Sequence, residues 1–289
     1  MAQVAVIGSG VMGSAVTRAC ADAGLSVAVW NRTPARVPRH AGVTRHDEVA
    51  DAVRAAPIVV SALLNYDVAH EVLGPVLGEL AGRTLVQTSS GAPAEVGPLA
   101  DAVHGAGGSY LEAAILNYPQ AIGTAGAFTV YAGPVATYES VSPLTDAVSG
   151  TRIHLGPELT TAKAYLLVAA AYYYACVNGF LECAAMALDQ GVPLPAFARS
   201  VPMYQAGLQS TVDTGVELIA RGDYTFEQAP LTTHLDILRY LPGFAAQAGV
   251  TDSFLPAVRD RVQRAVDLGG SREHIAVVVE QFRAGRAAG

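Results

Sequence analysis

The stretch VAVIGSGVMG, residues 4–13, decides how the first half of this chain folds. Its first four residues are apolar and predict a buried strand. The pattern G-x-G-x-x-G follows at Gly8, Gly10 and Gly13, where a helix begins. The first glycine allows a tight turn, the second lets a pyrophosphate approach the backbone, and the third lets helix and strand pack closely. A helix N-terminus also presents N–H donors to phosphates. The stretch therefore predicts a dinucleotide-binding β–α unit.

Short apolar runs alternate with helical stretches through the rest of the first half. Strands are predicted at residues 4–8, 26–30, 58–63, 84–88, 109–114, 128–132 and 151–155. Helices are predicted at residues 12–23, 68–80 and 93–106, and a short helical stretch begins at 35–37. Such alternation implies a parallel sheet with helices on both faces, so we expect an α/β domain over residues 1–158.

The second half is helical by period. Helices are predicted at residues 160–190, 195–209, 212–221, 228–249, 255–268 and about 272–283, with glycine and proline at the joints. We therefore expect an all-helical domain over residues 159–289, joined to the first domain by one long helix at about 160–190.

The composition raises the question of where the apolar surface goes. Of the 289 residues, 51% are hydrophobic and only 15% are charged, whereas roughly 25% is typical of soluble proteins. The mean hydropathy is +0.32. The net charge of −7 argues against nucleic-acid binding, because it gives no attraction to phosphate backbones. The apolar content excludes disorder. What remains is a globular protein, a membrane protein, or an oligomer that hides apolar surface between subunits.

Residues 164–188 form an almost wholly apolar run, long enough to cross a bilayer, which takes about 20 residues. Asn178 and Glu182 interrupt the run, and neither a second span nor a polybasic flank accompanies it. We therefore expect a helix buried in protein, surrounded by other helices of this or another subunit, rather than a membrane span.

The cysteines and the N-terminus indicate the compartment. Cys20, Cys176 and Cys183 show no metal-ligand spacing, and we expect three small buried side chains in a reducing cytosol and no metal site. The N-terminus reads as a strand rather than as a signal peptide. The predicted location is cytoplasmic.

The end of the second strand indicates which dinucleotide is bound. An NAD site usually has an acidic residue there, which holds the ribose 2′-hydroxyl. This chain has Asn31, Arg32 and Thr33, with Arg36 one helical turn further, and no carboxylate at that point to repel a 2′-phosphate. NADP(H) is therefore predicted; the alternative is that Arg32 is only a solvated turn residue.

Several motifs resemble the β-hydroxyacid dehydrogenase superfamily, and within it the NADPH-dependent imine reductases and reductive aminases. They are the glycine motif with Met12, the run VWNRT at residues 29–33, the Ser-Gly-x-Pro turn at 90–93, and the element NGFL at 178–181 on the apolar helix. The resemblance implies an α/β Rossmann domain with a parallel sheet, followed by an all-helical C-terminal dimerisation domain. It also implies a homodimer that exchanges helical domains, with each active site between one Rossmann domain and the partner's helical domain.

The expected cofactor site follows from the motif and the resemblance together. The predicted cofactor-binding residues are Gly8, Ser9, Gly10, Val11, Met12, Asn31, Arg32, Thr33, Arg36, Leu63, Leu64, Thr88 and Ser90.

The catalytic positions of the family carry over unevenly. Imine reductases commonly have Asp, or Tyr or Asn, twelve residues before the Asn of NGFL; here that position is Leu166, which cannot donate a proton. Tyr174 stands two turns further, where reductive aminases have a polar aromatic residue, and Tyr173 lies nearly beneath Leu166. Ser90 corresponds to a polar residue beside the substrate. Tyr174 is thus expected as proton donor or substrate orienter, with Tyr173 next. The alternative is that these rings pack a core or a dimer seam.

Lys163 lies one turn before Leu166, close to the helix lysine of the dehydrogenase relatives, but Leu159, Leu166 and Leu167 replace the Gly and Asn of their pattern. A desolvated Lys163 acts as an acid in one interpretation and is solvated in the other. His234 is expected either to reach the pocket or to be an ordinary interface histidine. The predicted catalytic residues are Tyr174, Ser90, Tyr173 and Lys163, and the predicted substrate pocket contains Asn117, Leu166, Tyr174 and His234.

These expectations favour an NADPH-dependent reductase that transfers hydride to a C=N bond of a small, largely apolar substrate. A cyclic imine can arrive already protonated, so Leu166 is tolerable there, whereas ketone reduction has to protonate or stabilise an alkoxide. The alternatives are a β-hydroxyacid or aldehyde reductase that uses Lys163, reduction of an activated C=C bond, and a catalytically silent NADP(H)-binding protein.

Overall fold

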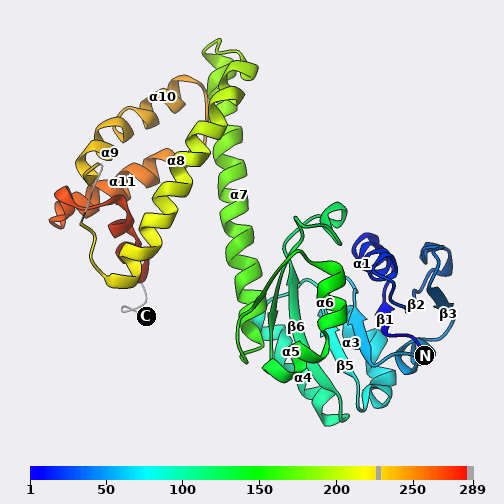
Figure 1. Ribbon diagram of the computed structural model, residues 1–289. Coiled ribbons are helices and arrows are strands. Elements are labelled where there is room, and N and C mark those ends of the chain that lie inside the picture. Colours follow the sequence, from blue (N-terminus) through cyan, green and yellow to red (C-terminus); the bar gives the residue numbers. More distant parts are fainter. Residues whose placement is uncertain (226–228, 285–289) are drawn as a thin grey trace. The chain divides into compact units, whose positions relative to one another are not determined.

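The computed structural model describes residues 1–225 and 229–284, and these form two compact units. Unit 1 comprises Met1–Tyr173 and unit 2 comprises Tyr174–Gly289 (Figure 1). The long helix α7 (Thr160–Asp189) contains the division between them.

Unit 1 is built on one sheet of eight strands in the order β3-β2-β1-β4-β5-β6-β7-β8. The strands are β1 (Val4–Ile7), β2 (Val27–Trp30), β3 (Val43–His46), β4 (Ile58–Ser61), β5 (Thr84–Gln87), β6 (Ser109–Ile115), β7 (Phe128–Ala132) and β8 (Thr151–His154). Neighbouring strands are parallel except β6 and β7, which are antiparallel. Only the 3-10 helix η3 (Pro119–Ala121) lies between these two, and a connection without a crossover helix returns the chain antiparallel.

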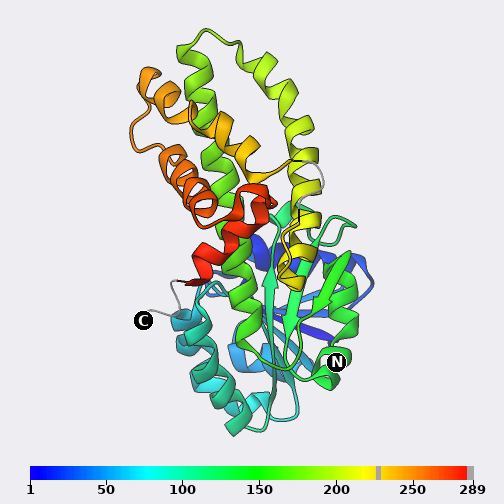
Figure 2. The ribbon, with the colours of Figure 1, turned by 90° about the vertical axis from the view of Figure 1, so that its left-hand side faces the viewer.

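Helices cover both faces of the sheet, as predicted (Figures 1 and 2). They are α1 (Val11–Asp22), α2 (Val49–Arg54), α3 (Tyr66–Leu73), α4 (Pro93–Gly105), α5 (Val135–Ser140) and α6 (Ser142–Val148), with the 3-10 helix η1 (Pro34–Arg36). The side chains of strand β1 show why helices are needed on both faces. Val4 and Val6 pack in one core with residues of α1 and α6, whereas Ala5 and Ile7 pack in a second core with residues of α2, α3 and α4. A strand buried on both faces is apolar throughout.

Several details of unit 1 differ from the predictions. The helix expected at 68–80 ends at Leu73, because Gly74 and Pro75 lead into the 3-10 helix η2 (Gly74–Leu80). Strand β3 and the helices α2, α5 and α6 were not predicted. Strand β3 is a short edge strand with polar residues and no buried side chain, so it carries no apolar run to reveal it.

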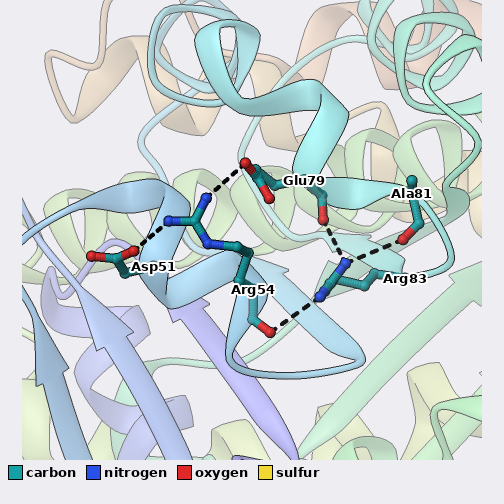
Figure 3. A network of polar contacts seen from close by, with 5 residues as sticks. All are labelled: Asp51, Arg54, Glu79, Ala81 and Arg83. Carbon is teal, nitrogen blue, oxygen red and sulfur yellow. Dashed lines mark hydrogen bonds and ion pairs between the residues drawn. The ribbon is translucent and has the colours of Figure 1, made fainter.

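A polar network lies where strands β4 and β5 begin (Figure 3). Arg83 donates to the carbonyl oxygens of Glu79 at 2.8 Å, Arg54 at 3.1 Å and Ala81 at 3.2 Å. Arg54 in turn pairs with Asp51 and, at 2.7 Å, with Glu79. The network therefore fixes the loops at the amino ends of these strands.

Unit 2 is helical, as predicted, with somewhat different bounds. Its elements after α7 are α8 (Leu194–Arg221), α9 (Leu231–Leu238), α10 (Leu241–Gln247), α11 (Leu255–Asp267), η4 (Gly270–Arg272), η5 (Ile275–Val278) and α12 (Val279–Ala284). The helices expected at 195–209 and 212–221 are one continuous helix. The helix expected at 228–249 is divided before Pro242, and its first residue lies outside the described residues. The segment expected at 272–283 is largely 3-10 helix before α12 begins.

Two aromatic rings and an apolar core hold unit 2 together. After the turn at Gly191, α8 runs back in the opposite direction to the second half of α7 (Figure 2). The rings of Phe180 and Phe197 stack between these helices with centroids 5.9 Å apart. A separate core joins α9 to α11 through Leu231, Leu235 and Val262.

The most apolar part of helix α7 is not buried by its own chain. By length and composition it is the one helix in the described part of the chain that is apolar enough to cross a membrane, and its most apolar 18-residue window contains no buried residue. Val168 is 72% exposed and Leu181 is 56% exposed.

Of the three cysteines only Cys20 is buried, and burial raises the pKa of its thiol to about 12. The prediction of three buried cysteines is therefore wrong for the single chain, since Cys176 is exposed.

Candidate active site

A cleft of about 560 Å³ opens at the carboxyl ends of the parallel strands of unit 1. It lies where the strand order reverses between β1 and β4, which is the usual ligand site of an open α/β sheet. Its lining residues are Gly8, Gly10, Val11, Met12, Asn31, Arg36, Ala62, Leu63, Leu64, Thr88, Ser90, Ala114, Ile115 and Leu166. The cleft thus brings together most of the predicted cofactor residues and Leu166 of the predicted substrate pocket.

The glycine turn has the geometry that a dinucleotide needs. Gly8 has a φ of +102°, and a Cβ there would lie 2.6 Å from the Ala62 carbonyl oxygen. A Cβ at Gly13 would lie 2.0 Å from the Gly8 carbonyl oxygen, so the packing of α1 requires glycine. A Cβ at Gly10 would meet nothing within 4 Å. Gly10 therefore leaves open space beside the first residue of α1, where a pyrophosphate fits.

The end of β2 is tied to the glycine turn. The Ser9 N–H donates to Asn31 Oδ1 at 2.8 Å, and Asn31 Nδ2 donates to the Thr33 carbonyl at 2.9 Å. The Ser9 hydroxyl donates to the Arg36 carbonyl oxygen at 3.2 Å. The side chains of Ser9 and Asn31 thus hold the turns around the cleft in place, and Arg36 is one of the residues that line it.

Arg32 has a partner that the local sequence does not reveal. Its Nη2 lies 3.0 Å from Oε1 of Glu71, which comes from α3, 39 residues away in the chain. The residues at the end of β2 include no carboxylate, as the sequence indicates, but the folded protein brings the carboxylate of Glu71 to Arg32. Only the placement of α3 against the sheet brings Glu71 there.

The far end of the cleft is largely apolar. Leu166, Ala114 and Ile115 line it from α7 and β6, and Leu166 contributes no polar side-chain atom. Two hydroxyl-bearing residues, Thr88 and Ser90, also line the cleft. Thr88 donates to the Ser61 carbonyl oxygen at 2.7 Å, which fixes its rotamer, whereas the side chain of Ser90 is exposed.

Lys163 does not line the cleft, contrary to its prediction as a catalytic acid. Its side chain is 0% exposed, and Nζ lies 2.8 Å from Oε1 of the equally buried Glu112 and 2.9 Å from the Ala113 carbonyl oxygen. The Tyr110 hydroxyl donates to Glu112 Oε2 at 2.6 Å, and the ring of Tyr66 lies beneath the ammonium. Burial raises the pKa of Glu112, and the Lys163 ammonium opposes this shift. The Lys163 amine thus has a structural role, because the buried Glu112 carboxylate would be costly without a cation beside it.

Asn117 and Tyr173 lie close to the same edge of unit 1. Asn117 Oδ1 accepts the Phe128 N–H at the start of β7, and Asn117 is not among the lining residues of the cleft. The Tyr173 hydroxyl lies 3.4 Å from the Tyr118 hydroxyl. Asn117 was predicted to contact substrate. In the structure its side chain instead holds the chain between β6 and β7 in place.

Tyr174 and His234 belong to unit 2. Tyr174 lies on α7, is 62% exposed, and its carbonyl accepts a hydrogen bond from Asn178 Nδ2 at 2.8 Å. His234 lines a second cavity of about 210 Å³, together with His274 and hydroxyl-bearing residues of α8. Burial lowers the pKa of His234, and the neighbouring His274 lowers it further. A neutral imidazole at physiological pH is the consequence.

The buried ion pair generates a stability prediction. Lys163→Met leaves the Glu112 carboxylate without its cation, and we expect a loss of about 3–5 kcal/mol in the free energy of unfolding. The double variant Lys163→Met with Glu112→Gln removes both charges, and it should recover most of the loss. Urea unfolding followed by circular dichroism measures both variants. Equal instability of the single and double variants would contradict a role of the charge pair.

Two protein-family models together match nearly the whole chain. Residues 3–156 match the NAD binding domain of 6-phosphogluconate dehydrogenase. Residues 158–284 match the C-terminal domain of proteins described as NADPH-dependent reductive aminase-like. The first match covers more than half of the chain and includes every residue of the glycine turn.

Relatives of known activity or structure match over full length. The NADPH-dependent reductive aminase of Aspergillus oryzae (strain ATCC 42149 / RIB 40) is 23% identical over 98% of both chains. The imine reductase of Myxococcus stipitatus in complex with NADP+ is 26% identical, with a TM-score of 0.87 over 96% of this chain and 99% of that one. The imine reductase from Pseudomonas sp. is also 26% identical, with a TM-score of 0.86 over 97% and 99%. The chain therefore belongs to the imine reductase and reductive aminase family of oxidoreductases, in which a dinucleotide-binding domain precedes a helical domain.

Proposed function

We propose that this chain is an NADPH-dependent reductase that adds hydride to the C=N bond of a small, largely apolar imine or iminium. The observation that carries the proposal is the single cleft that runs from the glycine turn to the apolar wall at Leu166. The relatives named as an NADPH-dependent reductive aminase and as an imine reductase in complex with NADP+ support it.

The residues that follow the carboxyl ends of β1 and β2 would hold the cofactor. The N–H groups at the start of α1 would bind the pyrophosphate beside Gly10. The guanidinium of Arg36, which lines the cleft, would bind the 2′-phosphate together with that of Arg32, which is not among the lining residues. Leu63, Leu64, Thr88 and Ser90 line the rest of the cofactor path. When bound, the reduced nicotinamide supplies the hydride.

The substrate end of the cleft accounts for the choice of a C=N bond. Leu166, Ala114 and Ile115 exclude water from the reacting carbon and offer no acid. An iminium that arrives protonated needs none, whereas a ketone yields an alkoxide that must be protonated or stabilised. Tyr174 is the proposed proton donor or substrate orienter, with Tyr173 next, and Ser90 is the proposed polar contact of the substrate.

The alternatives differ in how well the geometry supports them. The β-hydroxyacid or aldehyde reductase requires Lys163, and the buried pair with Glu112 removes its amine from the cleft. Reduction of an activated C=C bond and a silent NADP(H)-binding protein both agree with an apolar cleft that lacks an acid.

We further propose a cytoplasmic homodimer that exchanges helical domains, with a functional boundary at residues 158/159. The exposed apolar residues of α7 support it, because a contiguous apolar surface of this kind marks a protein or membrane contact. In this dimer the cleft of one subunit receives His234 from the helical domain of the other.

A substrate scan tests the function. Purified protein should oxidise NADPH, followed by absorbance, with cyclic imines, and much more slowly with aldehydes or activated alkenes. With NADP+ in place of NADPH, it should oxidise 3-hydroxy acids only slowly. Turnover of only acids or aldehydes would overturn the C=N assignment. Cofactor binding without turnover of any substrate would favour the silent protein.

Two substitutions in the glycine turn distinguish an effect on folding from an effect on cofactor binding. Gly13→Ala should lower the melting temperature, since its Cβ would lie 2.0 Å from the Gly8 carbonyl oxygen. Gly10→Ala should leave the melting temperature unchanged, because its Cβ has open space, and should raise the Kd for NADPH roughly tenfold, or about 1.4 kcal/mol. Fluorescence titration of NADPH measures the binding. Unaltered affinity in Gly10→Ala would place the pyrophosphate elsewhere.

Removal of one hydroxyl tests the proposed donor. With an imine that arrives unprotonated, Tyr174→Phe should lower kcat roughly 10²-fold, with the KM for NADPH unchanged, because the phenol would supply the proton. Tyr172→Phe, two residues earlier on the same helix and on another side of it, is the matched control and should retain activity. Normal steady-state kinetics in Tyr174→Phe would remove its hydroxyl from the mechanism.

A further inference from the structure

We propose that Glu71 is a specificity-determining residue that competes with the 2′-phosphate of NADPH for Arg32 and so narrows the preference for NADPH over NADH. The inference rests on the proposed placement of the 2′-phosphate at Arg32. It adds a residue of α3 to the 2′-phosphate site, which the sequence assigns only to the end of β2 and the turn after it.

The position of Glu71 is fixed by the structure around it. Helix α3 begins after Leu63 and Leu64 of the cleft, and the Asn65 side chain caps it by accepting the Val68 N–H at 3.0 Å. Val72 and Leu73 of the same helix are buried in the core of unit 1. With the helix anchored in this way, Glu71 faces outward and its Oε1 lies 3.0 Å from Arg32 Nη2.

The ion pair is open to exchange of partners. The side chains of Arg32 and Glu71 are 67% and 64% exposed, and exposed pairs of this kind are weak. A phosphate dianion binds a guanidinium more strongly than one carboxylate does, because it offers more charge and more acceptors. Arg32 can therefore leave Glu71 for the phosphate, but the carboxylate stays close by on its rigid helix and repels the new anion.

Glu71 would interact differently with NADH at the same position. Its ribose carries a hydroxyl where NADPH carries the phosphate, so Glu71 repels nothing and offers an acceptor for that hydroxyl. An acidic residue at the end of β2 has this role in NAD sites. Glu71 supplies from α3 the carboxylate that the end of β2 lacks.

Glu71→Gln tests the competition by direct binding. We expect the Kd for NADPH to fall roughly three- to tenfold at low ionic strength, with no improvement for NADH. The gain should shrink as salt is added, because both groups are exposed. Fluorescence titration of each reduced cofactor gives the Kd without reference to turnover. An unchanged ratio of the two Kd values overturns the inference.

Glu79→Gln is the matched control. It makes the same substitution in a surface ion pair, with Arg54 at 2.7 Å, in the network at the amino ends of the strands (Figure 3). The cleft lies at their carboxyl ends. We expect Glu79→Gln to leave both Kd values unchanged, and a gain equal to that of Glu71→Gln would show a general charge effect and overturn the inference.

Two further variants separate this inference from the proposed function. Arg32→Ala should raise the Kd for NADPH far more than that for NADH, and equal effects would refute the 2′-phosphate placement itself. If Arg32→Ala discriminates while Glu71→Gln does not, the placement stands and only the role of Glu71 fails. In the Arg32→Ala background, Glu71→Gln should improve NADPH binding much less than it does alone. An undiminished gain there overturns competition for Arg32.

Discussion

The absence of a side chain at Gly13 is the constraint on which the rest of unit 1 depends. A Cβ at that position would overlap the Gly8 carbonyl oxygen and crowd Ala62 after β4, so only glycine lets α1 start this close to the sheet. The close start places the N-terminus of α1 at the point where β1 separates β2 from β4. The cleft beside the start of α1, where the N–H groups of the helix can meet an anionic ligand, depends on that placement.

A buried charge pair fixes the other end of the cleft. Lys163 joins α7 to Glu112 and to the Ala113 carbonyl of β6, and the residues next to them, Ala114, Ile115 and Leu166, form the apolar wall. Buried ion pairs seldom stabilise a fold more than well-packed apolar side chains would. We therefore infer that the main effect of the pair is to fix the position of α7 relative to β6. It also explains why a lysine next to the site is not available for proton transfer.

The sequence predicted mainly strands that are largely apolar, because burial on both faces of the sheet leaves a continuous signal, and in addition the polar edge strand β8. It did not predict β3, whose exposed edge position needs no such run, or the antiparallel direction of β7, which follows from a connection too short to cross over. Most of the predicted cofactor residues meet in one cleft. Lys163 and Asn117 do not line it, since polar partners within the fold, Glu112 and the Phe128 N–H, engage their side chains.

The sequence by itself determined the order of the two domains, the glycine turn and the long apolar helix, because each depends on neighbours in the chain: steric freedom at glycine, and the period of apolar residues. The tertiary structure alone decided which distant groups meet. It brought Glu71 to Arg32 across 39 residues and Glu112 to Lys163, and it left α7 exposed along its most apolar stretch. Electrostatic contacts of this kind act through space over a few ångströms, so no local pattern in the chain records them.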